Sequence, residues 1–229
     1  MGESAMSQQP VRLAVFDFDG TSLDGSSTVH LVLDLLSKRK ISLLTGIQTG
    51  LWGVAYKFHL PQNESWVRSK VWKAFQGRSA AKVDAWLADY YDRVCEHLWR
   101  ASAQEAMESH RAQGCKVVMV SASFEPIVRR CVELHPIDHQ ISTRMAVMPD
   151  GTYGNAVDGQ PIEGPQKLSA LRAFADSTFG PGNWVIEAAY GDHYSDKTLL
   201  DAAEHPHAVS PGPTLRRYAK EQGWPVLSW

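Results

Sequence analysis

Cysteine is scarce in this chain of 229 residues, with only Cys95, Cys115 and Cys131, far apart and without a CxxC pair. An odd, sparse set of this kind argues against a disulfide framework or a cysteine zinc site, and it fits a reducing compartment. We therefore expect a cytoplasmic protein. The opening segment, MGESAMSQQP, has neither an apolar core nor a basic flank, so it is not typical of a signal peptide. Residues 1–10 are interpreted as a flexible arm.

A strong charge of one sign is also missing. The chain has 23 Lys and Arg against 25 Asp and Glu, a formal net charge of -2, and no run of like charges is long enough to form an interaction tail. This balance excludes a generally basic surface, so we expect neither nucleic acid nor anionic lipid as a partner. The sequence does not indicate an oligomeric state.

An uninterrupted apolar span is absent too, although residues 41–60, ISLLTGIQTGLWGVAYKFHL, approach the length of one. Gln48, Lys57, His59 and three glycines interrupt this segment. We interpret it as helical packing inside the fold. Contact of the segment with a membrane surface is the alternative.

Short apolar runs are present and predict the strands of a sheet, at residues 11–16, 116–120, 184–190, 207–209 and 225–227. Because these runs are nearly continuous rather than alternating, they favour strands buried on both faces of a parallel sheet. Helical patterns lie between them. Pro126 and Pro213 suit the first turns of helices, Ser195 an N-cap, and Gly223 a helix end. Strands alternating with helices predict an α/β fold.

The first two predicted strands are separated by about a hundred residues, far more than one crossover helix needs. Apolar residues recur at steps of three and four over residues 79–99 and 27–36, which predicts amphipathic helices there. We therefore expect a helical cap over residues 24–100, inserted into a core of residues 11–23 and 101–229. Asp-Gly and Gly-Asn steps within residues 148–164 predict a short β-hairpin.

Two aspartates, Asp17 and Asp19, follow the first predicted strand in the stretch VFDFDGTS. Residues two apart in an extended segment point to the same side, and the carboxyl ends of parallel strands are where open α/β sheets bind ligands. Buried carboxylates need a cation or a proton. An ordinary Asp-Gly turn is one alternative. A calcium loop is another, but Gly20 arrives too early for it and no glutamate closes the loop.

Polar residues follow other predicted strands as well. Ser121 and Ser123 end the second run, Lys167 lies in the first turn of a predicted helix, and Asp192 and Asp196 follow the run at 184–190. Taken singly, each has an ordinary explanation: a helix-capping serine, a solvated lysine, or acids that complement a helix dipole. Taken together, several acids at one edge need a cation, and hard oxygen ligands of this density fit Mg²⁺.

The order DxDGT, strand-end serine, lysine and GDxxxD resembles the haloacid dehalogenase-like (HAD) hydrolase superfamily. The chain is similar to its phosphoserine-phosphatase-like branch, subfamily IB, over residues 11–229, including SASFEPIVRR, STRMAVMPDGTYG and the closing HAVSPGPTLRRYAKEQGWPVLSW. The resemblance implies a Rossmann-like parallel sheet flanked by helices, with a helical cap inserted after the first strand. It also implies a phosphomonoesterase.

The resemblance further implies roles for two residues of the first motif. Asp17 would be the nucleophile that forms an aspartyl-phosphate, and Asp19 the general acid and then the general base. An acid at the position of Asp19 favours phosphatase chemistry.

The other motif residues would bind the phosphoryl group and the metal. Ser121 and Lys167 would hold phosphoryl oxygens, and Asp192 would complete a Mg²⁺ site with Asp17 and the main-chain carbonyl of Asp19. Asp196 would orient Lys167 or a metal-bound water. The supporting positions are Gly20 and Thr21.

Three positions depart from the family pattern. Ser22 replaces the usual leucine after DGT, and His193 replaces serine after the fourth-motif aspartate; for His193 we favour a packed or supporting position over direct tuning of the site. Ser26 stands where phosphoserine-specific members carry a glutamate for the substrate ammonium, which argues against phosphoserine itself.

The cap offers the surface that remains for the rest of the substrate. Residues 62–79 combine Arg68 and Arg78 with two lysines and two tryptophans, which predicts a basic, aromatic face. A solvated helix face is the alternative. We expect a small phosphorylated metabolite, a phosphorylated amino acid or amino alcohol such as phosphoserine or histidinol phosphate. A phosphotransferase or mutase, a lipid-phosphate phosphatase with a membrane-contacting cap, and a non-enzymatic phosphate- or partner-binding protein remain alternatives.

Overall fold

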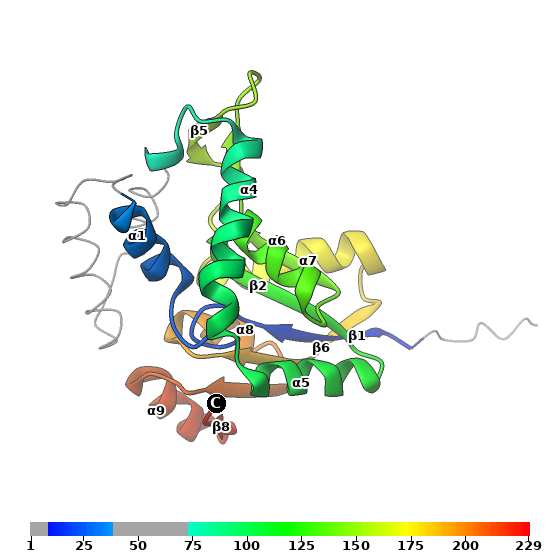
Figure 1. Cartoon of the computed structure of the whole chain (residues 1–229). Coiled ribbons are helices and arrows are strands. Elements are labelled where there is room, and N and C mark those ends of the chain that lie inside the picture. Colours follow the sequence, from blue (N-terminus) through cyan, green and yellow to red (C-terminus); the bar gives the residue numbers. More distant parts are fainter. Residues whose placement is uncertain (1–8, 39–72) are drawn as a thin grey trace, which may run out of the picture.

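The computed structural model describes residues 9–38 and 73–229. Its centre is a six-stranded sheet in the order β3-β2-β1-β6-β7-β8, in which every neighbouring pair is parallel (Figure 1). The strands are β1 (Val11–Phe16), β2 (Lys116–Phe124), β3 (His139–Thr143), β6 (Trp184–Gly191), β7 (His205–Val209) and β8 (Val226–Leu227). The predicted parallel α/β fold is confirmed.

Strand β1 has apolar residues on both sides, and each side faces a separate apolar core. Ala14 and Phe16 join the core that includes α5 (Ala101–Ala112) and α6 (Glu125–Leu134). Leu13 and Val15 join the opposite core. That core includes α7 (Pro165–Phe179), α8 (Lys197–Leu200) and α9 (Pro213–Gln222). Helices therefore cover both faces of the sheet, which explains why its strands read as continuous apolar runs.

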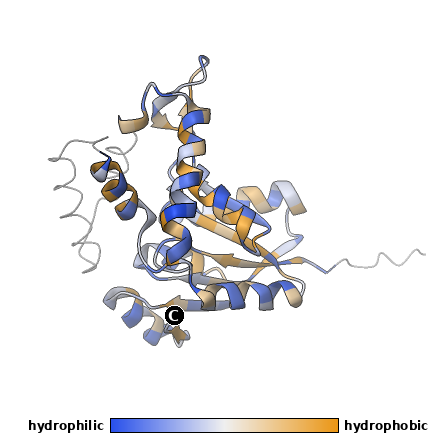
Figure 2. Cartoon of the chain, viewed as in Figure 1, coloured by the Kyte–Doolittle hydropathy of each residue, from blue (hydrophilic) through white to orange (hydrophobic). Residues whose placement is uncertain are grey.

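The hydropathy of the chain follows this arrangement. Figure 2 shows apolar residues along the strands and mixed polar and apolar residues on the surrounding helices. Among the residues that the structure describes, no helix is both long enough and apolar enough to cross a bilayer.

The sequence located most element ends well but not all of them. Pro126 and Pro213 lie in the first turns of α6 and α9, and Gly223 ends α9 in the left-handed conformation (φ 71°). The prediction of Ser195 as an N-cap was wrong. His193 caps the short 3-10 helix η3 (Tyr194–Asp196), because its imidazole accepts the main-chain N–H of Ser195.

Within residues 24–100 the described elements are helical. They are α1 (Ser27–Ser37), α4 (Ala80–Tyr90), the π-helical turn η1 (Tyr91–Cys95) and the 3-10 turn η2 (Glu96–Leu98). The single helix predicted over 79–99 is therefore interrupted after Tyr90. Helix α4 projects away from the edge of the sheet (Figure 1). The apolar segment 41–60 lies outside the described residues.

The predicted hairpin is present as β4 (Met145–Val147) and β5 (Tyr153–Val157), an antiparallel pair. It begins three residues before the predicted range of 148–164. The hairpin contacts the chain just before α4, where the main-chain N–H of Tyr153 donates to the carbonyl of Arg78 at 2.9 Å. The Tyr153 hydroxyl also donates to Asp84 of α4. The hairpin thus supports the outer end of α4 (Figure 1).

The last residue of β1 offers a test of this core. Phe16 is fully buried and stacks on Tyr190 with ring centroids 4.3 Å apart. Because Phe16→Ala leaves a cavity between packed layers, we expect it to lower the free energy of unfolding by about 3–5 kcal/mol in urea titrations. Val147→Ala, at a side chain that is 56% exposed, should change it by less than about 0.5 kcal/mol. Equal effects of the two substitutions would contradict this packing.

Candidate active site

The site lies where the carboxyl ends of neighbouring strands meet. Asp17 directly follows β1, Asp192 directly follows β6, and these two strands are paired in the sheet. The main-chain N–H of Asp17 donates to the carbonyl of Tyr190 at 3.0 Å, which extends the pairing to the site. Parallel pairing therefore places two acids that are 175 residues apart in the chain at one edge.

Three buried carboxylates form what we call the acid cluster: Asp17, Asp192 and Asp196. Each offers an oxygen, and these oxygens lie within 4.8 Å of one another. Asp196 comes from η3, the turn that follows Asp192, and its side chain is only 1% exposed. Carboxylates this close and this deeply buried repel one another and require positive charge nearby.

Lys167 supplies one positive charge. Its ammonium nitrogen lies 2.5 Å from Asp17 Oδ1 and 2.6 Å from Asp196 Oδ1. Although burial lowers the pKa of Lys167, the two carboxylates outweigh burial and raise it above its ordinary value, so the lysine stays charged. Lys167 lies in the first turn of α7, as predicted, where the cluster compensates for the unfavourable helix dipole.

One lysine does not neutralise three acids. Burial, with a smaller contribution from the Asp196 carboxylate, raises the pKa of Asp17 to about 7, although Lys167 opposes this rise. The pKa of Asp192 lies well above its ordinary value, first because of burial and then because of Asp17 and Asp196. A set of three close carboxylates with only one lysine beside them fits a hard divalent cation such as Mg²⁺.

The loop after β1 is shaped around Asp192. Gly20 adopts a positive φ of 78°, and a Cβ atom there would lie 2.2 Å from Asp192 Oδ2. The Thr21 hydroxyl donates to Asp192 Oδ1 at 3.3 Å. Only glycine at position 20 therefore leaves space for the Asp192 carboxylate, which accounts for the glycine that follows Asp19 in the DGT motif.

Asp19 has different surroundings from the acid cluster. Its carboxylate accepts hydrogen bonds from the main-chain N–H of Ser27, from the Ser27 hydroxyl at 3.0 Å and from the Ser123 hydroxyl. Burial raises the pKa of Asp19, and the bonds from Ser123 and Ser27 oppose this effect. The Asp19 side chain is thus held among neutral donors, and only its main-chain carbonyl is left for the metal role predicted from sequence.

Ser121 lies near the end of β2, next to β1 in the sheet, and is 1% exposed. Its hydroxyl accepts the main-chain N–H of Ser123 at 3.0 Å. Its two lone pairs and its rotatable proton leave further hydrogen-bonding capacity.

The two unusual motif residues both have structural partners. Ser22 is fully buried, and its hydroxyl donates to the main-chain carbonyl of Asp17 at 2.7 Å, so the polar side chain is satisfied and braces the loop. His193 caps η3, with Nδ1 2.9 Å from the Ser195 hydroxyl. Its main-chain N–H donates to Asp196 Oδ2 at 3.3 Å. His193 therefore helps to place Asp196.

The structure describes one of the two arginines predicted from the basic segment. Arg68 lies outside the described residues. Arg78 is exposed and borders a cavity of about 500 Å³ with Phe75 and Trp86. Among the described residues that line this cavity, none belongs to the acid cluster.

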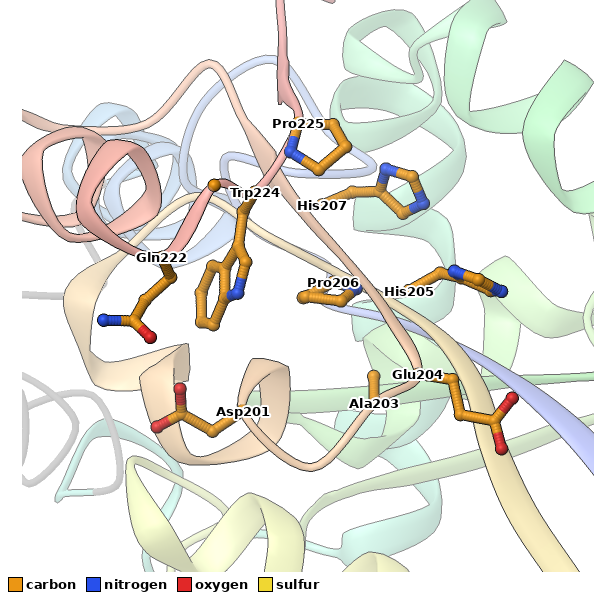
Figure 3. A pocket seen from close by; sticks show the side chains of 10 residues that line it. Asp201, Ala203, Glu204, His205, Pro206, His207, Gln222, Trp224 and Pro225 are labelled. Carbon is orange, nitrogen blue, oxygen red and sulfur yellow. The ribbon is translucent and has the colours of Figure 1, made fainter.

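A further cavity, of about 480 Å³, lies at the amino end of β7, where Trp224 and Pro206 face each other (Figure 3). Because Asp17 and Asp192 follow the carboxyl ends of their strands, this cavity belongs to the opposite edge of the sheet. It is therefore separate from the acid cluster.

Comparison with known proteins identifies the family. The haloacid dehalogenase-like hydrolase family matches residues 14–201. The chain belongs to this family. A probable phosphatase of Mycobacterium tuberculosis is 29% identical over 94% of this chain and 75% of its own length. The inhibition of morphological differentiation protein of Streptomyces azureus is 27% identical over 96% and 79%. A histidinol-phosphatase of Neisseria meningitidis is 29% identical over 54% and 56%.

Solved structures share the fold. A Bordetella pertussis protein of unknown function superposes with a TM-score of 0.81 at 22% identity, over 96% of this chain and 99% of the other. A substrate-bound phosphoserine phosphatase has a TM-score of 0.66 at 19% identity, over 96% and 93%. The family and the relatives named phosphatase identify the chain as an enzyme of the phosphatase class.

The raised pKa values predict how the metal-free protein responds to pH. A carboxyl whose folded pKa exceeds its unfolded value destabilises the fold progressively as pH rises from the unfolded pKa through the folded one. In EDTA at about pH 7.5, Asp192→Asn should therefore raise the melting temperature by about 2–4 °C, and this gain should shrink towards about pH 5.

Asp158→Asn is the control, because the Asp158 side chain is largely exposed beside Arg144. We expect no comparable gain from it in thermal melts. If Asp192→Asn lowered the melting temperature in EDTA, the electrostatic repulsion inferred for the acid cluster would be wrong.

Proposed function

We propose that this chain is a Mg²⁺-dependent phosphomonoesterase that acts on a small phosphorylated metabolite through an aspartyl-phosphate on Asp17. The observation that carries the proposal is the buried Asp17, held 2.5 Å from Lys167 beside Asp192 and Asp196. This arrangement combines a nucleophilic carboxylate with positive charge at one point. Catalysis of phosphoryl transfer rests almost entirely on positioning the groups that react and on stabilising their charge.

In this proposal the side chains of Asp17 and Asp192 and the main-chain carbonyl of Asp19 hold Mg²⁺. When bound, the ion would neutralise charge on the phosphoryl group and on the acids. Asp196 remains paired with Lys167. The space that Gly20 leaves at Asp192 supports this assignment.

The first step transfers the phosphoryl group. A carboxylate oxygen of Asp17 attacks phosphorus, and the bond from phosphorus to the ester oxygen breaks. Asp19, in its protonated form, donates its proton to that departing oxygen, so the product leaves as an alcohol. Lys167 and Ser121 donate hydrogen bonds to the phosphoryl oxygens during the transfer.

The second step regenerates the enzyme. Asp19 is now a carboxylate, and it accepts a proton from a water molecule as that water attacks the phosphorus of the aspartyl-phosphate. The bond from phosphorus to the Asp17 oxygen breaks, and inorganic phosphate is released. The neutral hydrogen-bond donors around Asp19 suit both forms, because hydroxyl groups also accept.

A phosphorylated amino acid or amino alcohol is the substrate class we propose. Its support is the relative named histidinol-phosphatase and the fold shared with phosphoserine phosphatase. Phosphoserine itself is disfavoured by position 26. The Ser26 hydroxyl caps α1 by accepting the N–H of Val29 at 3.4 Å, and serine carries no charge for a substrate ammonium.

We further propose that residues 24–100 form a cap domain over a core of residues 11–23 and 101–229. Support comes from the two connections, which lie side by side. The N–H of Asp24 donates to the carbonyl of Leu98 at 2.8 Å, and the N–H of Arg100 donates to that of Ser22 at 3.0 Å. We assign contact with the substrate to the cap, with Arg68 and Arg78 as its candidate residues.

Activity assays test the nucleophile. We expect the wild-type protein with Mg²⁺ to release phosphate from at least one ester in a panel of phosphorylated amino acids, amino alcohols and sugars. Asp17→Asn should lower kcat by at least about 1000-fold, since the amide is not a nucleophile. Asp158→Asn should keep the wild-type rate. Full activity of Asp17→Asn, or phosphate release from no ester, would refute the proposal.

Metal binding is tested without any substrate. Saturation with Mg²⁺ at about 100 times its dissociation constant should stabilise the EDTA-treated protein by about 2.7 kcal/mol. This stabilisation is measured as the rise in melting temperature when Mg²⁺ is added. Asp192→Asn should lose most of the rise, whereas Asp158→Asn should retain it. An equal gain in both variants would place the ion elsewhere.

A further inference from the structure

The proposed proton donor, Asp19, is held by hydroxyl groups from two separate parts of the chain. Ser27 is the first residue of α1, and Ser123 lies in β2. Both hydroxyls donate to the same oxygen, Oδ2 of Asp19. The two hydroxyl oxygens are also 2.9 Å apart. Ser27 and Ser123 are 0% and 3% exposed, so water does not compete for these bonds.

The end of β2 explains why Ser123 reaches Asp19. The pairing of β2 with β3 is irregular between Ser121 and Phe124. Within this irregular stretch the N–H of Ser123 turns back to the Ser121 hydroxyl at 3.0 Å. The hydroxyls of these two serines thus have different partners: that of Ser121 accepts the N–H of Ser123, and that of Ser123 donates to Asp19. Ser121 is left for the phosphoryl group, and the Ser123 hydroxyl is committed to Asp19.

The other hydroxyl is fixed from the segment we propose as the cap. The Tyr90 hydroxyl, at the end of α4, donates to the main-chain carbonyl of Ser27 at 2.7 Å. Tyr90 is fully buried, and the π-helical turn η1 begins directly after it. The helix predicted over 79–99 is therefore interrupted directly after the residue that holds Ser27. Such π-turns are frequent at functional sites.

We propose that Ser123 is a positioning residue, which holds the Asp19 carboxyl group in the orientation that transfers a proton to the departing ester oxygen. Ser27, held by Tyr90, is its partner in this role. The inference rests on the proposed function, because it assigns to Ser123 a contribution to one step of that reaction. It separates Ser123 from Ser121, which the proposed mechanism uses for the phosphoryl oxygens.

The role has a chemical signature. Without the Ser123 hydroxyl, Asp19 keeps its carboxyl group but loses a hydrogen bond that fixes its orientation. Esters whose departing oxygen is strongly basic need the proton, whereas 4-nitrophenolate leaves without it. A positioning defect should therefore slow the hydrolysis of an ester with a basic leaving group selectively. A general structural defect slows all esters alike.

The experiment compares 4-methylphenyl phosphate with 4-nitrophenyl phosphate, which have similar shapes but differ in leaving-group basicity. The value of kcat/KM is measured for the full chain with Mg²⁺, because it includes only the steps up to departure of the phenol. Ser123→Ala should lower it roughly 10- to 100-fold for the methylphenyl ester and less than about threefold for the nitrophenyl ester. Ser123→Thr, which keeps the hydroxyl, should restore most of the loss.

Two further variants complete the test. Tyr90→Phe removes the hydrogen bond from the Tyr90 hydroxyl to the main-chain carbonyl of Ser27. It should change the ratio of the two kcat/KM values in the same direction, roughly threefold. This variant also serves if Ser123→Ala does not fold. Ser142→Ala is the matched control. Ser142 is a buried serine of β3 whose hydroxyl donates to Gln140, and its loss should not change the ratio.

Equal losses for the two esters in Ser123→Ala, or no loss for either, would overturn the inference and leave the proposed function intact. If the wild-type protein hydrolysed neither ester and no member of the metabolite panel, the proposed function itself would fail, and the role of Ser123 with it.

Discussion

The ion pairs of Lys167 with Asp17 and Asp196 are the interaction on which the site depends. Three carboxylates are buried at one edge of the sheet, and the ammonium group of Lys167 offsets part of the cost of burying them. These ion pairs also restrict where helix α7 can begin. Helix α7 must begin at this edge to present Lys167 in its first turn, and its apolar residues Leu168 and Leu171 anchor it on the sheet.

Two acids of one short motif acquire different properties from this arrangement. Asp17 lies among charged groups, next to Lys167 and near Asp196, whereas Asp19 lies among the hydroxyls of Ser27 and Ser123. Acids in different environments take on different tasks in many enzymes. The proposed division between nucleophile and proton donor therefore follows from surroundings, because the two residues are chemically identical.

The predictions from sequence succeeded where a pattern was local and strong. The strand at 11–16 and the helix stop at Gly223 were located correctly. They failed where packing overrode the pattern. Strand β3 was missed because His139, Gln140 and Ser142 give this edge strand a polar character. The amphipathic pattern over 79–99 continued through the π-turn, and periodicity alone does not register a change of helix type.

The sequence by itself determined the fold class and the set of acids, serine and lysine, because apolar runs and strand-end motifs are written in consecutive residues. Only the tertiary structure decided which of these residues meet. It brought Asp196 into the acid cluster and turned the Asp19 side chain towards Ser123, a residue 104 positions away. Such contacts depend on strand order, on the irregular end of β2 and on where α1 begins. These are properties of packing between distant segments.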